Sequence, residues 1–144
     1  MSGKLFSNGI FGVFVPAGWN CFYGIDSEGK TTPKKLHIYK DAQTEFDIFT
    51  HAGLTICYYG KDEHFLSPKF FYDHVQDLEP FECGHYQWNG YTCTSMGYPY
   101  TMLTAMANGA VFYVMVLTQN GEHQISLQDA DVRAILESIA ACVE

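Results

Sequence analysis

Hydrophobic side chains alternate with polar ones in some segments of the chain and run together in others, which predicts strands of two kinds. Segments 36–39 and 54–59 alternate, so we expect them to form half-exposed strands. Segment 10–15 is a short apolar run closed by a proline, and it predicts a buried strand from which segment 19–25 returns as another. The run 110–117 is apolar throughout. We expect it to be an interior strand with helices, or a helix and a loop, covering its two faces.

Two Asn-Gly pairs lie between strand-like runs, at Asn89-Gly90 and at Asn108-Gly109. This dipeptide is the strongest short-range signal for a two-residue hairpin turn. A third turn is expected around residues 97–99, where glycine and proline lie close together. The three turns together predict an antiparallel meander over residues 81–118.

Two segments carry the start signals of a helix. Ser67 and Pro68 suit the cap and the first position, and apolar side chains follow at helical spacing, so a short helix is predicted near 68–78. A second helix is predicted near the C-terminus, where Ser126 and Asp129 have the spacing of a capping box. We expect this helix to pack on the sheet through one apolar stripe, made of Val132, Ile135, Leu136 and Ile139.

Length and composition predict one folded domain over residues 1–144. The chain has 144 residues, of which 47% are hydrophobic and 17% are charged, so it has enough apolar surface to build a core. No internal repeat, low-complexity segment or linker divides it. With both strands and helices expected, the fold class is predicted to be α+β.

The first ten residues and the spacing of the cysteines indicate the cellular compartment. Residues 1–10 lack the apolar stretch of a signal peptide, and the five cysteines are widely spaced without a Cys-x-x-Cys pair. These features predict a reducing, cytoplasmic setting. The alternative is that an export signal or a lipid anchor has been removed from the chain.

The net charge of −8 is unevenly distributed along the chain. Residues 1–40 contain five lysines and two acids, whereas residues 41–144 contain fourteen acids and three bases. An acidic surface repels nucleic-acid phosphates and anionic lipid headgroups. The charge therefore argues against nucleic acid and membrane as partners.

Three short motifs resemble those of a known family. They are the Pro16-Ala17-Gly18-Trp19 turn, the Trp88-Asn89-Gly90-Tyr91 segment and the C-terminal stretch 129–139. In their order the chain resembles the PsbP-like superfamily, which includes an extrinsic subunit of the plant oxygen-evolving complex and a yeast nuclear-import factor that binds Ran. The resemblance implies a three-layer α/β/α sandwich, with a central, mainly antiparallel sheet and the C-terminal helix packed on it. It also implies an accessory or protein-binding role, and it transfers no functional residues.

The residues that could carry catalysis or bind a metal form no recognisable motif. Cys83 and His85 would share one face of a strand, but a metal site needs more ligands than these two. Asp62, Glu63 and His64 could serve acid–base chemistry, although a solvated loop is the favoured interpretation. The chain also lacks a nucleophile elbow, a phosphate loop and a His-Glu-x-x-His motif. No catalytic residue, metal or cofactor is therefore expected.

Segment 41–82 combines carboxylates with aromatic side chains, and this pattern has two interpretations. It could form an aromatic anchor with an acidic rim that binds a basic protein. The favoured alternative is a helix whose aromatic side chains face the core and whose acids face water. For a binding surface, the candidate residues are Asp73, Asp77 and Glu79, with Tyr98 and Tyr100 beside Pro99 as a second exposed pair.

The leading functional hypothesis is thus a non-catalytic accessory or protein-binding domain, with a basic protein as the partner. The alternative is a small enzyme or small-ligand binder that uses a pocket between the sheet and the helix. A third possibility is self-association through an open sheet edge.

Overall fold

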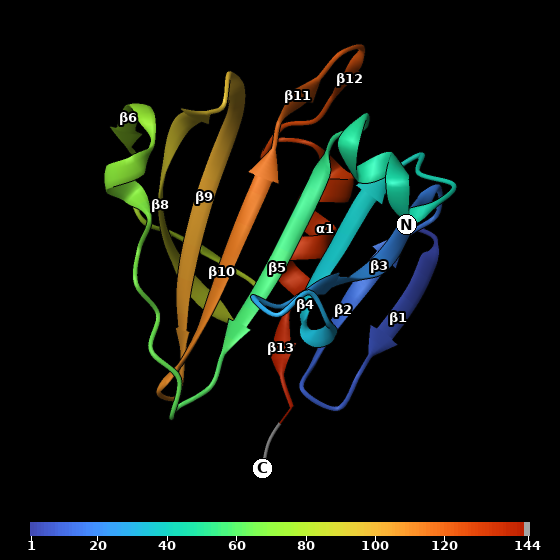
Figure 1. Ribbon diagram of the computed structural model, residues 1–144. Helices are drawn as coiled ribbons and strands as arrows, with labels where there is room; N and C mark the ends of the chain where they lie inside the picture. The colour runs from blue at the N-terminus through green and yellow to red at the C-terminus, as the bar shows by residue number, and fades with distance from the viewer. Residues whose placement is uncertain (143–144) are drawn as a thin grey trace.

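A large antiparallel sheet is the frame of the molecule. The computed structural model describes residues 1–142, and most of this range is β-strand. Figure 1 shows the sheet as a curved layer of long strands, and each strand is antiparallel to its neighbours. In order across the sheet, the strands are β3 (Trp19–Ile25), β4 (Thr31–Lys40), β5 (Gly53–Tyr59), β10 (Ala110–Leu117), β9 (Tyr98–Ala107), β8 (Tyr86–Ser95) and β6 (Asp73–Asp77), with β7 (Phe81–Cys83) paired to β8.

A smaller sheet and one α-helix lie against one side of the large sheet, which we call the inner face. The small sheet has the order β1-β2-β13, so β2 pairs on one edge with the N-terminal strand and on the other with the C-terminal strand. The helix makes most of its contacts with β2. These elements are β1 (Gly3–Ser7), β2 (Phe11–Pro16), β13 (Ala140–Ala141) and α1 (Ala130–Ser138).

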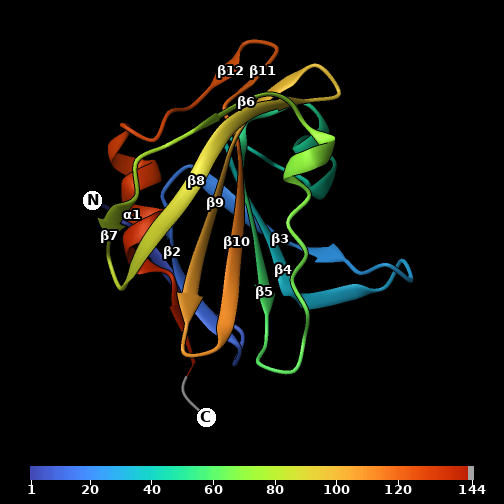
Figure 2. The same cartoon turned by 90° about the vertical axis from the view of Figure 1, so that its left-hand side faces the viewer.

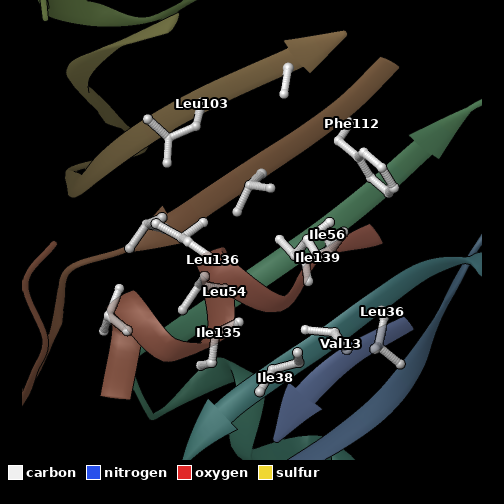
Figure 3. Close-up of a cluster of buried hydrophobic side chains, with 14 of the residues drawn as sticks. Val13, Leu36, Ile38, Leu54, Ile56, Leu103, Phe112, Ile135, Leu136 and Ile139 are labelled. Atoms are coloured by element: carbon white, nitrogen blue, oxygen red, sulfur yellow. The ribbon is translucent and has the colours of Figure 1, made fainter. Parts of the chain in front are cut away.

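The main core is formed where this inner layer meets the large sheet. Figure 3 shows aliphatic side chains from β2, β4, β5, β9, β10 and α1 pointing toward one another. Burial of so much apolar surface is the dominant favourable contribution to folding. The labelled members of the cluster, all exposed by no more than 1%, are Val13, Leu36, Ile38, Leu54, Ile56, Leu103, Phe112, Ile135, Leu136 and Ile139.

The remaining elements are short. Two 3-10 turns, η1 (Glu45–Phe49) and η2 (Lys69–Phe71), lie on the side of the large sheet opposite α1, as Figure 2 shows. A two-stranded hairpin, β11 (Gln119–Asn120) and β12 (His123–Gln124), precedes the helix. Among residues 1–142, every helical segment is too short to cross a lipid bilayer.

The predicted three-layer α/β/α sandwich, with a C-terminal helix packed on a central sheet, is wrong. The described chain is mostly β, contains one α-helix and has several antiparallel sheets. A sandwich needs helices on both faces of the sheet. Here the second face carries only two short 3-10 turns of the described chain, η1 and η2, instead of helices.

The helix predicted near 68–78 is also wrong. The chain makes the single η2 turn and then becomes β6, which pairs with β8 at the edge of the sheet. In β6, Val75 is half-buried and the other four residues are exposed. Of the apolar side chains that suggested a helix, Val75 is therefore the one that this strand turns toward the protein. Pairing with the free edge of β8 outweighs the local helix-start signal at Ser67 and Pro68.

One of the two predicted Asn-Gly turns is confirmed and the other is wrong. Asn108 and Gly109 connect β9 to β10, and both have the positive φ that a two-residue hairpin turn requires (53° and 89°). Asn89 and Gly90 instead lie within β8. Gly90 is needed there because a Cβ atom would lie 2.2 Å from the backbone oxygen of Met102 on β9.

The prediction of an interior strand at 110–117 is confirmed. β10 lies between β5 and β9 in the middle of the large sheet. It is buried on both faces, with Val114 in the main core and Tyr113 in a second cluster on the opposite face. The helix near the C-terminus begins later than its signals indicated, since Asp129 is the cap and accepts a hydrogen bond from the Ser126 backbone N–H (3.0 Å).

Replacement of Gly90 by alanine is expected to lower the free energy of unfolding by about 1–3 kcal/mol, because the new methyl group would collide with the backbone of β9. Urea denaturation measures this difference. Gly12→Ala on β2 is the matched control, because the nearest atom to its new methyl group, the Phe6 backbone oxygen, would be 3.4 Å away. Equal stability of the two variants would contradict the packing role of Gly90.

Candidate functional site

The face of the large sheet turned away from α1, which we call the outer face, is rich in aromatic, sulfur-containing and hydroxyl side chains. One row crosses it from β4 to β8, through neighbouring strands in register. The two ends of this row differ in exposure, since His37 is half-exposed whereas Tyr91 is buried. The row consists of His37, Thr55, Met115, Met102 and Tyr91.

The connection between β5 and β6, residues 60–72, crosses part of the outer face, and we call it the strap. Phe65 anchors it by packing between Tyr59 and Tyr113, with 5.1 Å between ring centroids in each pair. At its far end, the Tyr72 hydroxyl lies 3.4 Å from the hydroxyl of Tyr113. These contacts join an element with little regular structure to the interior strand β10.

A charged contact holds the η2 turn of the strap. The Lys69 ammonium donates to the Asp77 carboxylate on β6 (2.6 Å) and lies 5.2 Å from the centre of the Tyr91 ring. Both partners belong to the edge of the sheet, so the turn is attached at its base. An exposed ion pair contributes little stability by itself, and its effect here is to define where the turn lies.

The same turn presents two phenylalanines to solvent. Phe70 is 96% exposed and Phe71 is 86% exposed, and Leu66 earlier in the strap is 75% exposed. The four aromatic residues of the strap therefore form two pairs that face opposite sides. Phe65 and Tyr72 face the sheet and fix the strap, whereas Phe70 and Phe71 face water.

The η1 turn presents a second exposed pair, and Figure 1 shows it on the other side of the outer face from η2. The Asp47 carboxylate accepts the backbone N–H groups of Gln43 (2.7 Å) and Thr44 (3.2 Å), which closes the turn and lowers the pKa of this carboxyl. Phe46 and Phe49 remain 70% and 71% exposed.

The structure brings some of the predicted binding residues together and separates others. Asp73 and Tyr98 lie at the same end of β8, because β8 pairs with β6 through Thr94 and with β9 through Ser95. Asp77 forms an ion pair with Lys69, and Glu79 is exposed beyond the end of β6. Tyr98 is 44% exposed, whereas Tyr100 is half-buried between the outer-face clusters.

Sequence reasoning missed the role of η1, and it favoured a buried role for the aromatic residues of the strap. Helical spacing was the wrong guide for residues 65–72, because the strap is not a helix. The contrast between Phe65 and Tyr72 on one side and Phe70 and Phe71 on the other follows from tertiary contacts with β5 and β10. Nothing in the local sequence distinguishes these four residues.

Four titratable side chains of the outer face, two tyrosines, a cysteine and a histidine, have pKa values shifted toward their uncharged forms. Burial raises the pKa of the Cys57 thiol to about 11 and that of the Tyr39 hydroxyl to about 12. Burial, and then hydrogen bonding with Tyr72, raises the pKa of Tyr113. Burial and the Lys35 charge lower the pKa of His37 to about 4, and its Nδ1 lies 2.7 Å from the Thr55 hydroxyl. The Cys57 thiol therefore keeps its proton at neutral pH, and the His37 imidazole is uncharged there.

The expected pairing of Cys83 and His85 on one strand face is not observed. Cys83 is the buried last residue of β7, and His85 lies in the turn that leads to β8. Within residues 1–142, no group of three or more His, Cys, Asp or Glu side chains is arranged to hold a metal ion. One hollow, of about 540 Å³, lies away from the helix and is lined by strands β3, β4 and β5 and the start of the strap.

No protein-family model matches the chain, and no curated protein matches it. The resemblance to PsbP-like proteins stays a prediction, and the sandwich that it implies differs from the observed fold.

His37 is expected to make stability depend on pH. Its pKa falls from 6.5 in the unfolded chain to about 4 in the folded protein, so the unfolded state binds a proton more readily between these values. The free energy of unfolding should therefore decrease as the pH falls from 6.5 to about 4, with a slope of at most about 1.4 kcal/mol per pH unit. Urea denaturation at several pH values measures it, and His37→Asn should flatten the slope. An unchanged slope in that variant would show that other groups cause it.

Proposed function

We propose that this protein is a non-catalytic binding domain that holds a basic protein partner against the exposed phenylalanines of its outer face. The observation that carries this proposal is the pair Phe70 and Phe71, almost fully exposed on a turn whose base is anchored by Phe65 and Lys69. The partner would cover these rings and the adjoining half-exposed part of the sheet.

Two adjacent exposed phenylalanines leave a large amount of apolar surface in water. Burying one such side chain contributes about 1.5–3 kcal/mol of stability. Phe70 and Phe71 stay exposed in the folded chain, so this stabilisation is left for a partner to gain. Contiguous exposed apolar residues with polar neighbours are typical of interaction sites. Phe46 and Phe49 on η1 extend the same apolar character to the other side of the outer face.

The anchoring of the strap supports binding as well as exposure does. A surface that is already in place loses less conformational entropy when its partner arrives. Phe65 near the middle of the strap and Tyr72 at its end both contact Tyr113 on β10, and Lys69 holds the turn between them. The exposed rings are thus carried by a fixed element rather than by a free loop.

Charge favours a basic partner. Asp73 and Glu79 are exposed, and neither forms an ion pair within the described chain. Glu45 on η1 is also exposed, and the whole chain has a net charge of −8. Acidic groups around an apolar centre speed the approach of a positively charged protein and exclude acidic ones.

The edge strand β6 is poorly suited to self-association by strand addition. Its pairing with β8 is irregular between Asp73 and Gln76, where His74 has a positive φ of 56°. Asp73 and Asp77 add exposed acidic side chains to this short edge. Irregularity and charge are the devices that protect natural sheet edges from pairing. This argues for a partner that binds side chains of the outer face.

Replacing both Phe70 and Phe71 by serine is expected to reduce partner capture about tenfold or more, because the anchor rings are lost. The measurement is a pull-down from lysate of the native organism, quantified by mass spectrometry against the unmodified protein. The folded state should be unaffected, since both rings are exposed.

Leu5→Ser on β1 is the matched control, because Leu5 is 81% exposed and belongs to the small sheet. It should capture the same partner as the unmodified protein. A second variant, Asp73→Asn with Glu79→Gln, should weaken capture mainly at low salt. Full capture of the same proteins by the double serine variant would refute the proposed surface.

A further inference from the structure

A hollow of about 540 Å³ lies at the opposite end of the outer face from the β8–β9 turn. It is bounded by the β3–β4 hairpin, by the end of β5 and by the first residues of the strap. Figure 2 shows the tip of this hairpin projecting on the same side of the sheet as the strap. The volume is within the range of small-molecule sites, about 300–1,000 Å³.

The carboxylates around this hollow are already engaged. Oδ1 of Asp26 accepts the backbone N–H groups of Glu28 (2.9 Å) and Lys30 (3.0 Å) within the hairpin turn. Oε1 of Glu63 accepts the Lys34 ammonium and the Gly60 N–H, each at 2.8 Å. The Lys34–Glu63 pair also connects the hairpin to the strap. These two carboxylates therefore stabilise the segments that form the walls of the hollow.

The remaining polar groups are donors. Ser27, Thr32 and the hydroxyl of Tyr59 line the hollow. Burial raises the pKa of Tyr59, so its hydroxyl keeps its proton at neutral pH. Among residues 1–142, Lys35 forms no ion pair, although it lines the same hollow and is half-buried. The hydroxyl groups and the unpaired Lys35 ammonium offer hydrogen-bond donors to an anionic ligand group.

The position of Lys35 is defined by a glycine on the neighbouring strand. A Cβ atom on Gly24 would lie 2.6 Å from Cγ and 2.7 Å from Cδ of Lys35, so the lysine stem occupies the space that the glycine leaves. The pairing of β3 with β4 is irregular at this point, between Tyr23 and Gly24. The charge of Lys35 is close enough to His37 and Cys57 to act on both. The stem of Lys35 therefore lies against β3 at Gly24.

We propose that this hollow binds a small organic anion, with Lys35 pairing with a carboxylate or phosphate group and Tyr59 and Ile25 contacting an aromatic or apolar body. The anionic group would lie between the Lys35 ammonium and the hydroxyls of Thr32 and Ser27. The body would contact Tyr59 of β5 and Ile25 of β3, which supply the apolar part of the wall on this face. This ligand site is separate from the exposed phenylalanines of η2 and does not depend on a protein partner.

Three probes test the proposal by NMR titration of the ¹⁵N-labelled protein. Benzoate and phenyl phosphate carry the two candidate anionic groups on the same ring, and benzamide is the neutral counterpart of benzoate. We expect saturable shifts at residues 25–35 and 57–63 with at least one anion, and much weaker shifts with benzamide. The stronger of the two anions identifies the headgroup.

Two lysines of the same hairpin region provide the variant and its control. Lys35→Met should weaken binding about tenfold or more, because a charge-assisted contact is lost. Lys35→Arg should retain much of the affinity, and Lys30→Met, an exposed lysine that does not line the hollow, should leave it unchanged. Gly24→Ala, which displaces the lysine stem, should weaken binding while the total charge stays the same.

Three results would overturn the proposal: no saturable binding of either anion, equal binding of benzamide, or equal loss in Lys30→Met and Lys35→Met. The last result would indicate a general effect of charge. Loss of partner capture in the phenylalanine variant has no bearing on these titrations.

Discussion

Strand β10 has apolar side chains on both faces, and the chain must therefore cover the middle of the large sheet twice. On the inner face, Val114 packs among side chains of β2 and α1, which bring a helix and a second sheet to the core. On the outer face, Tyr113 is covered by Phe65 and approached by Tyr72, and both belong to the strap. The two covers differ in kind. The inner one is regular and thick, whereas the outer one is a connection with a single short turn.

This asymmetry determines where the protein can bind other molecules. A connection lacks a second apolar layer above it, so any aromatic side chain that does not face the sheet faces water. Phe70 and Phe71 are in this position, and Lys69 between the strap and β6 keeps them there. The strap also begins beside the β3–β4 hairpin, where Glu63 pairs with Lys34. One connection thus contributes to an apolar surface at one end and to a polar hollow at the other.

Similar local signals in the sequence lead to different structures in different parts of the fold. Asn108-Gly109 lies at a true hairpin turn, and the unbroken apolar run of β10 identified an interior strand. Asn89-Gly90 has the same letters, but Gly90 is required by the approach of β9, which no local pattern reveals. Ser67 and Pro68 resemble a helix start, yet the edge of β8 takes the following residues into β6. Where long-range pairing decides, local propensity is a weak guide.

For the candidate sites, too, the sequence predicted which residue types are present but not how the fold arranges them. Acidic and aromatic residues in segment 41–82 were visible in the sequence, including Asp73 and Asp77. Which aromatic residues are free could not be deduced, because Phe65 and Phe70 differ only in what the rest of the fold places beside them. No sequence motif marked Lys35 as a candidate binding residue. Its importance depends on Gly24 in the neighbouring strand and on the acids that are already paired around it.

The pairing of β2 with β13 has a consequence for how the protein is made. β2 is synthesised early, but one of its edges pairs with Ala140 and Ala141, and its core side chains pack against α1. Phe11 and Val13 therefore lack some of their final neighbours until residues 130–141 have left the ribosome. Contacts so distant in sequence slow folding and expose apolar surface while it proceeds. We expect the small sheet to be the last part of the molecule to assemble, and the nascent chain to be most prone to aggregation just before that step.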